Sequence, residues 1–100
     1  MDDKKDYISE NQKNLAMYAR VLGHPVRVYI IDLLRQQTCC YSGDLAQELP
    51  IAKSTLSQHL KELKRAGLIQ GEIMPPRIKY CLNTAKWEEA KALLRDFIMP

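Results

Sequence analysis

Residues 53–69, KSTLSQHLKELKRAGLI, decide the fold of this chain. Their leucines recur at helical spacing and a glycine follows, which predicts an amphipathic helix over residues 53–66. The inward positions are Leu56, Leu60 and Leu63. The other face is polar throughout and carries Ser54, Thr55, Ser57, Gln58, His59, Lys61, Glu62, Lys64 and Arg65. A helix with such a face fits the major groove of DNA, where hydrogen-bonding side chains meet base edges.

A shorter helix is predicted directly before this one. Ser42 can cap its N-terminus, Leu45, Ala46 and Leu49 supply its apolar positions, and Pro50 ends it. The connection to the next helix is then very short. Two helices joined by a tight turn form a helix-turn-helix, in which the second helix reads the DNA.

Two strand-like runs follow, over residues 68–73 and 78–82. In the second run apolar residues, Tyr80 among them, alternate with Lys79 and Cys81. The segment Met74-Pro75-Pro76-Arg77 joins the runs, so the pair predicts a hairpin with a stiff, basic tip. A helix-turn-helix with such a hairpin is the winged variant. The predicted fold is mainly α with a small β-hairpin, in the order α-α-α-α-β-β-α.

Helices are also predicted on both sides of this motif. The first two cover residues 7–22 and 25–37, with an extended segment over 38–41 after them. The last begins at Thr84 as its N-cap and covers 84–100. Its apolar stripe is wider than a small core needs, so we expect part of it to pair two subunits. The candidate dimer-interface residues are Leu15, Tyr18, Leu22, Trp87, Leu94, Phe97 and Ile98.

Length and composition are those of one globular domain. The chain has 100 residues, of which 46% are hydrophobic and 27% charged, and only residues 1–6 are expected to fray. No apolar run is long enough to span a bilayer and the N-terminus lacks a secretory pattern, so a cytoplasmic protein is expected. Residues 53–79 hold six basic and two acidic residues, a net +4 in a chain whose total is +3. This segregation is the electrostatic footprint of a phosphate-binding surface.

Double-stranded DNA is therefore the expected partner. Gln58 can bond an adenine edge, Lys53 and Lys61 can neutralise phosphates, and Arg77 and Lys79 can reach the neighbouring minor groove. The candidate DNA-binding residues are Lys53, Ser54, Thr55, Ser57, Gln58, His59, Lys61, Arg77 and Lys79. For His59 a structural role, bonding backbone or phosphate, is an equal alternative to reading bases.

The chain also resembles a known family over about residues 15–83. The resemblance is carried by Leu22-Gly23-His24-Pro25-Val26-Arg27, Asp44-Leu45-Ala46, Ser54-Thr55-Leu56-Ser57-Gln58-His59-Leu60, Lys64-Arg65-Ala66-Gly67-Leu68-Ile69 and Tyr80. These pieces are similar to the ArsR/SmtB family of bacterial winged-helix repressors. The resemblance implies a homodimer joined through its first and last helices, a palindromic operator, and release by an inducer that is often a metal ion. It also favours a capping and packing role for His24, and a structural or phosphate-contacting role for Arg27.

The metal-binding pattern of the family does not carry over. Thiophilic-metal sensors place a Cys-x-Cys pair immediately before the Asp-Leu of the third helix, where this chain has Tyr41 and Gly43. Other members use histidines of the last helix, and residues 84–100 contain none. No metal site or cofactor is predicted, and a small-molecule or metal inducer stays unidentified.

The cysteines leave one further hypothesis open. Cys39, Cys40 and Cys81 are an odd number in a chain without an export pattern, so reduced thiols are expected, with Cys81 serving in packing. Cys39 and Cys40 could nevertheless make the chain a thiol-based metal or redox sensor, although neighbouring residues on a strand point to opposite faces.

The sequence also bears on two other classes of function. A winged helix can bind protein instead of DNA, so a protein-interaction module is the alternative from a different class. An enzyme is not expected, because the sequence shows no phosphate-binding glycine loop, no nucleophile-base pair and no metal-ligand cluster.

Overall fold

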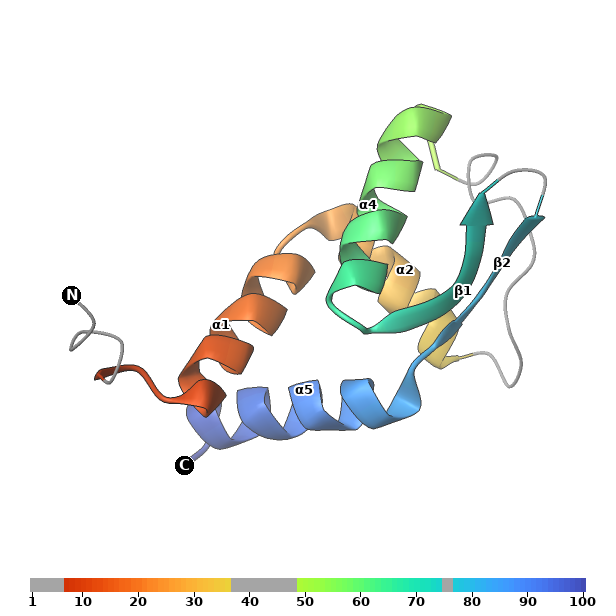
Figure 1. The fold of residues 1–100 in the computed structure, drawn as a ribbon. Helices are drawn as coiled ribbons and strands as arrows, with labels where there is room; N and C mark the ends of the chain where they lie inside the picture. Colours follow the sequence, from red (N-terminus) through yellow and green to blue (C-terminus); the bar gives the residue numbers. More distant parts are fainter. Residues whose placement is uncertain (1–6, 37–48, 75–76) are drawn as a thin grey trace.

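The computed structural model describes residues 7–36, 49–74 and 77–100, with the side chains of 73–78 left out. In chain order the elements are α1 (Glu10–Leu22), α2 (Pro25–Arg35), α4 (Lys53–Arg65), β1 (Ile69–Met74), β2 (Arg77–Leu82) and α5 (Thr84–Ile98). Helix α1 packs against α5, while the hairpin β1-β2 curls beside α4 and α2 (Figure 1). The helix predicted over 42–49, the extended segment predicted over 38–41 and residues 1–6, which were expected to fray, fall outside the described residues, except for Leu49.

The first two helices begin at residues that cap them. Ser9 and Gln12 form a reciprocal capping box, so α1 starts at Glu10 and not at Tyr7 as the periodicity indicated. The imidazole of His24 accepts a hydrogen bond from the Val26 amide at 3.2 Å and so caps α2. The capping role expected for His24 is confirmed.

The last two helices differ at their N-termini. The side chain of Asn83 accepts a hydrogen bond from the Lys86 amide at 3.2 Å and caps α5. The prediction that Thr84 is the cap was wrong by one residue, because both side chains can cap and the apolar pattern does not choose between them. Helix α4 begins after Ala52 and has no side-chain cap.

The hairpin is antiparallel, with Ile69 opposite Leu82 and Met74 opposite Arg77. Gly71 sits within β1 at φ +126°, where an L side chain is rarely tolerated. A Cβ there would lie 2.2 Å from the Lys79 carbonyl oxygen on β2. Only glycine therefore lets the two strands approach this closely.

Every described element contributes to one core. Its buried apolar residues are Tyr18, Val21, Ile30, Ile31, Leu34, Leu56, Leu60, Leu63, Leu68, Ile69, Tyr80 and Ala90. The alternation predicted for β2 is seen in Tyr80, which is buried, and Lys79, which is exposed. Together with the order of elements, this packing confirms the winged helix-turn-helix fold. Within the described ranges, no helix has the length and apolarity that crossing a membrane requires.

Candidate nucleic-acid interface

The N-terminal half of α4 presents an open polar surface. Lys53, Ser54, Thr55, Gln58 and Lys61 are exposed and Ser57 is half-buried. Lys53 and Lys61 have no ion-pair partner among the residues that the structure describes. Since Ala52 offers no cap, the first amides of α4 also lack a side-chain acceptor. The surface can therefore donate hydrogen bonds from side chains and from the backbone.

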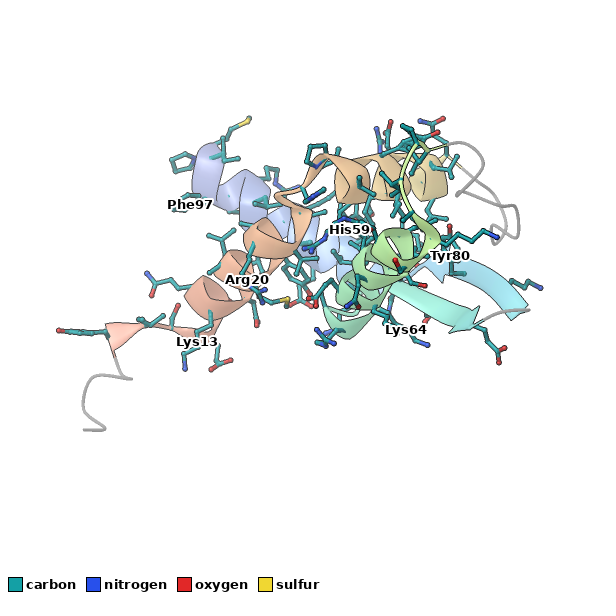
Figure 2. All side chains as sticks on the ribbon, turned by 90° about the horizontal axis from the view of Figure 1, so that it is seen from above. Lys13, Arg20, His59, Lys64, Tyr80 and Phe97 are labelled. Atoms are coloured by element: carbon teal, nitrogen blue, oxygen red, sulfur yellow. The ribbon has the colours of Figure 1, made fainter. Side chains whose placement is uncertain are left out.

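His59 does not belong to this surface. Only 8% of the residue is exposed, and its ring faces the junction between α1 and α2 (Figure 2). The interpretation of His59 as part of the exposed polar face was therefore wrong. A signal was present in the sequence: His59 lies three residues after Leu56 and four before Leu63, which places it on the inward stripe of the helix.

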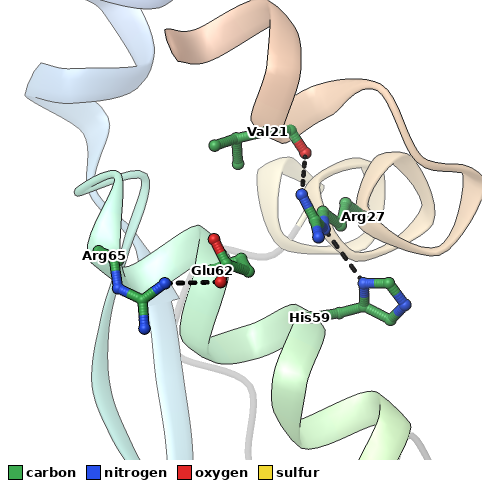
Figure 3. A network of polar contacts seen from close by, with 5 residues as sticks. All are labelled: Val21, Arg27, His59, Glu62 and Arg65. Carbon is green, nitrogen blue, oxygen red and sulfur yellow. Dashed lines mark hydrogen bonds and ion pairs between the residues drawn. The ribbon is translucent and has the colours of Figure 1, made fainter.

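Arg27 of α2 holds the inward-facing ring of His59. Its Nε donates a hydrogen bond to Nδ1 of His59 at 3.1 Å, and its Nη1 donates to the Val21 carbonyl oxygen of α1 at 3.1 Å (Figure 3). One guanidinium thus links three helices. This is the structural role that the sequence left open for Arg27 beside a phosphate contact.

The surroundings of His59 keep its imidazole neutral. Burial is the main cause that lowers the pKa of His59, and the positive charges of His24 and Arg27 lower it further. The rings of His24 and His59 lie 4.2 Å apart between centroids, tilted by 48°. A proton on His59 would therefore be poorly solvated and close to other cationic groups.

The hairpin and the end of α4 carry the remaining basic candidates. Lys79 on β2 is exposed, while the side chain of Arg77 lies outside the described residues. Lys64 donates to the Gly71 carbonyl oxygen at 2.6 Å, and Arg65 pairs with Glu62 at 2.6 Å. The structure thus sets the exposed cations Lys53 and Lys61 on α4 beside a hairpin that carries Lys79.

Comparison with known proteins decides the family. Residues 24–70 match the model of bacterial regulatory proteins of the arsR family, a helix-turn-helix family. The chain is 32% identical over 79 residues to the transcriptional repressor SdpR of Bacillus subtilis, and the match covers 79% of this chain and 87% of that protein. The chain belongs to the ArsR family.

Two further relatives match over different shares of this chain. The repressor SmtB of Mycobacterium tuberculosis is 38% identical over 63 residues, which are 63% of this chain and 46% of that protein. The regulator YgaV of Escherichia coli is 24% identical over 93 residues, with 93% of this chain and 94% of that protein covered. This chain thus spans most of SdpR and YgaV, but about half of SmtB.

The residues predicted to form a dimer interface differ in their exposure to solvent. Phe97 and Ile98 are 71% and 68% exposed at the end of α5, where Figure 2 shows Phe97 far from the hairpin. The half-buried candidates are Leu15, Leu22, Trp87 and Leu94. The sequence analysis did not single out Tyr7, Ile8 and Met99, which are also exposed apolar residues.

Tyr18 was misassigned as an interface residue. It is 1% exposed and lies in the core of this chain, where its hydroxyl is hydrogen-bonded with Glu89 of α5. Burial, followed by the charge and the hydrogen bond of Glu89, raises the pKa of Tyr18. An apolar stripe alone could not distinguish a core position from an interface position, because both bury the same kind of residue.

The cysteines differ from expectation at one position. Cys81 on β2 is disulfide-bonded, so the expectation of a reduced thiol with a packing role was wrong for this residue. Cys39 and Cys40 lie outside the described residues. Within the described ranges, no cluster of three or more His, Cys, Asp or Glu side chains could hold a metal ion.

Proposed function

We propose that the chain is a transcriptional repressor that binds a palindromic operator as a homodimer in the cytoplasm. The observation that carries this proposal is the exposed polar N-terminal half of α4, beside the hairpin. Among the described residues, neither Lys53 nor Lys61 has an ion-pair partner. In this arrangement α4 enters the major groove and Gln58 reaches a base edge. The hairpin, with Lys79, contacts the backbone or the minor groove alongside.

Dimerisation is supported by the apolar end of α5. Phe97, Ile98 and Met99 extend into solvent, and so do Tyr7 and Ile8, which precede α1. A second copy of this chain would cover both groups of residues. A two-fold dimer would also place two reading helices about 34 Å apart, the spacing of successive half-sites on one side of the duplex.

A mobility shift with the DNA upstream of the protein's own gene tests the proposal. We expect binding at low salt that weakens steeply as salt is added. The double variant Lys53→Glu with Lys61→Glu should abolish the shift. Lys13→Glu with Lys91→Glu changes the net charge equally on α1 and α5 and should leave most of the affinity, provided that sedimentation shows it to be dimeric.

The outcomes separate the classes of function. A folded wild-type protein that binds no DNA even at low salt would overturn the proposal and favour the protein-interaction module. Equal losses in both double variants would point to attraction by net charge alone, without a role for α4. DNA binding with a protein that stays monomeric would remove the palindromic operator from the proposal.

A second candidate concerns the signal that controls the repressor. Because Cys81 is disulfide-bonded, a thiol-based redox sensor deserves a direct test. Reduction by dithiothreitol delivers two electrons and two protons, opens the disulfide to two thiols and oxidises the reagent to its cyclic disulfide. We expect operator affinity to differ at least about fivefold between the two forms, a typical allosteric coupling. Cys81→Ser should remove the difference; equal affinities of reduced and oxidised wild type would refute this candidate.

A further inference from the structure

The hydrogen bond between Arg27 and His59 joins a side chain of α2 to a side chain of α4. The same guanidinium also holds the Val21 carbonyl oxygen near the end of α1. Figure 3 shows these bonds meeting at Arg27, beside the turn of α4 that carries His59. The apolar residues around these hydrogen bonds fill the core, but apolar contacts are not directional and do not by themselves fix the rotation of α4 about its axis. The two hydrogen bonds are directional and therefore fix how α4 is rotated.

The geometry of this contact requires a neutral imidazole. Nδ1 of His59 accepts the hydrogen bond from Arg27, so it must keep its lone pair and the ring proton belongs on Nε2. A second proton would turn Nδ1 into a donor that faces another donor. The bond to Arg27 would then be lost.

The charged groups around His59 would not compensate a second proton. Arg27 of α2 and His24, which caps that helix, both lower the pKa of His59. From α1, the Val21 carbonyl oxygen accepts a hydrogen bond from Arg27, and the cationic Arg20 lines a surface pocket with Glu62. The nearest carboxylate on α4 itself is that of Glu62, which pairs with Arg65. Strand β1 meets α4 through Lys64, whose ammonium donates to Gly71. A proton on His59 therefore disfavours the arrangement.

We propose that Arg27 and His59 are positioning residues, which hold the DNA-reading face of α4 in place only while His59 is neutral. This inference rests on the proposed function. Gln58 precedes His59 by one residue, about 100° around the helix, so a rotation that releases His59 also turns Gln58 away from its base. Operator binding should then weaken on acidification. Direct contact of His59 with a phosphate predicts the opposite, because an imidazolium would strengthen the contact.

Because the chain contains only two histidines, a pH titration of operator binding can test this proposal. The chain has two histidines, His24 and His59, and histidine is the side chain whose ordinary pKa lies between about pH 5 and 8. Operator affinity is measured by fluorescence anisotropy at constant ionic strength across that range, with folding followed by circular dichroism at each pH. We expect the affinity of the wild-type protein to fall by about fivefold or more towards the acidic end, within the usual range of coupling between sites.

Variants of His24, His59 and Arg27 identify which side chain causes the dependence of operator affinity on pH. His24→Asn preserves a capping side chain and should keep the acid-induced loss. His59→Gln retains an acceptor for Arg27 without a titrating ring and should give a nearly flat profile. Arg27→Gln should weaken binding at about pH 8, where His59 is neutral, and Arg27→Lys should restore part of it because a lysine can make one of the two bonds.

Each outcome bears on a different claim. Affinity that rises on acidification and is flattened by His59→Gln would overturn the positioning role in favour of a phosphate contact. A flat wild-type profile, or one that His24→Asn abolishes, would also overturn it. No binding at any pH would instead refute the proposed function.

Discussion

Helices α4 and α5 are both amphipathic, but they bury their apolar faces to different extents within the chain. The 13 residues of α4 bury Leu56, His59, Leu60 and Leu63 within the chain. The 15 residues of α5 bury only Ala90 and end in exposed Phe97 and Ile98. Helix α4 therefore completes its packing in the monomer and leaves a polar surface, whereas α5 leaves an apolar surface. On this difference rests the proposal that DNA binds at α4 and a second subunit at α5.

The largest expected effect comes from the inward face of α4. Leu63 is fully buried, and Leu63→Ala should lower the free energy of unfolding by about 2–5 kcal/mol, since it removes apolar contacts and leaves a cavity. Urea unfolding measures the change. Phe97→Ala is the matched truncation on α5 and should cost far less at low protein concentration. Equal costs for the two variants would contradict the contrast between the helices.

The next effect should appear in the association of two chains. Ile98→Asp places a charge in the proposed interface and should weaken dimerisation by about thirtyfold or more, the loss of about 2 kcal/mol that defines an interface hot spot. Sedimentation equilibrium measures the dissociation constant. Ala85→Asp adds the same charge at the exposed start of α5 and serves as the control. If both variants dimerise like the wild type, the apolar end of α5 is not the interface.

The helix N-termini allow a smaller, reciprocal test. Asn83→Ala removes the cap of α5 and should destabilise the protein by about 1 kcal/mol. Ala52→Ser adds a cap that α4 lacks and should stabilise it by up to about 1 kcal/mol. Thermal unfolding at one protein concentration measures both. A stabilising Asn83→Ala or a destabilising Ala52→Ser would show that the capping geometry is wrong.

The smallest effect should be a dependence of stability on pH. The pKa of His59 is lowered in the folded state, so protons bind more readily to the unfolded chain. The contribution of neutral His59 is thus fully present above the ordinary histidine pKa and is lost as the pH falls through the folded-state pKa. Urea unfolding of the wild type and of His59→Gln should diverge in that acidic range. Parallel curves would mean that His59 titrates as a solvated histidine.

Much of the fold could be predicted because its periodic signals are strong. The start of α4 at Lys53 was predicted correctly, and its end within one residue, since three leucines and a glycine mark it. Both strands were predicted within one residue, because Tyr80 and Lys79 alternate. The start of α1 was placed three residues too early, because the capping box of Ser9 with Gln12 is a local hydrogen-bond pattern that apolar periodicity does not contain.

The candidate site was harder to predict than the fold. Polarity assigned His59 to the solvent-facing side, whereas its place in the helix turns it toward Arg27, 32 residues away in sequence. Tyr18 was equally ambiguous, because its partner Glu89 comes from the far end of the chain. In both cases a polar partner that is distant in sequence decides where the side chain lies.

The hydrogen bond from Lys64 to the hairpin reduces the number of basic side chains on α4 that are available to bind DNA phosphates. Its ammonium is bonded to the Gly71 carbonyl oxygen, and Arg65 is paired with Glu62, so two of the four cations of α4 already have acceptors. Each lysine or arginine that stays on its intramolecular acceptor displaces one fewer counterion from the duplex. The logarithm of operator affinity should accordingly fall less steeply with the logarithm of salt concentration than the formal charge of residues 53–79 implies.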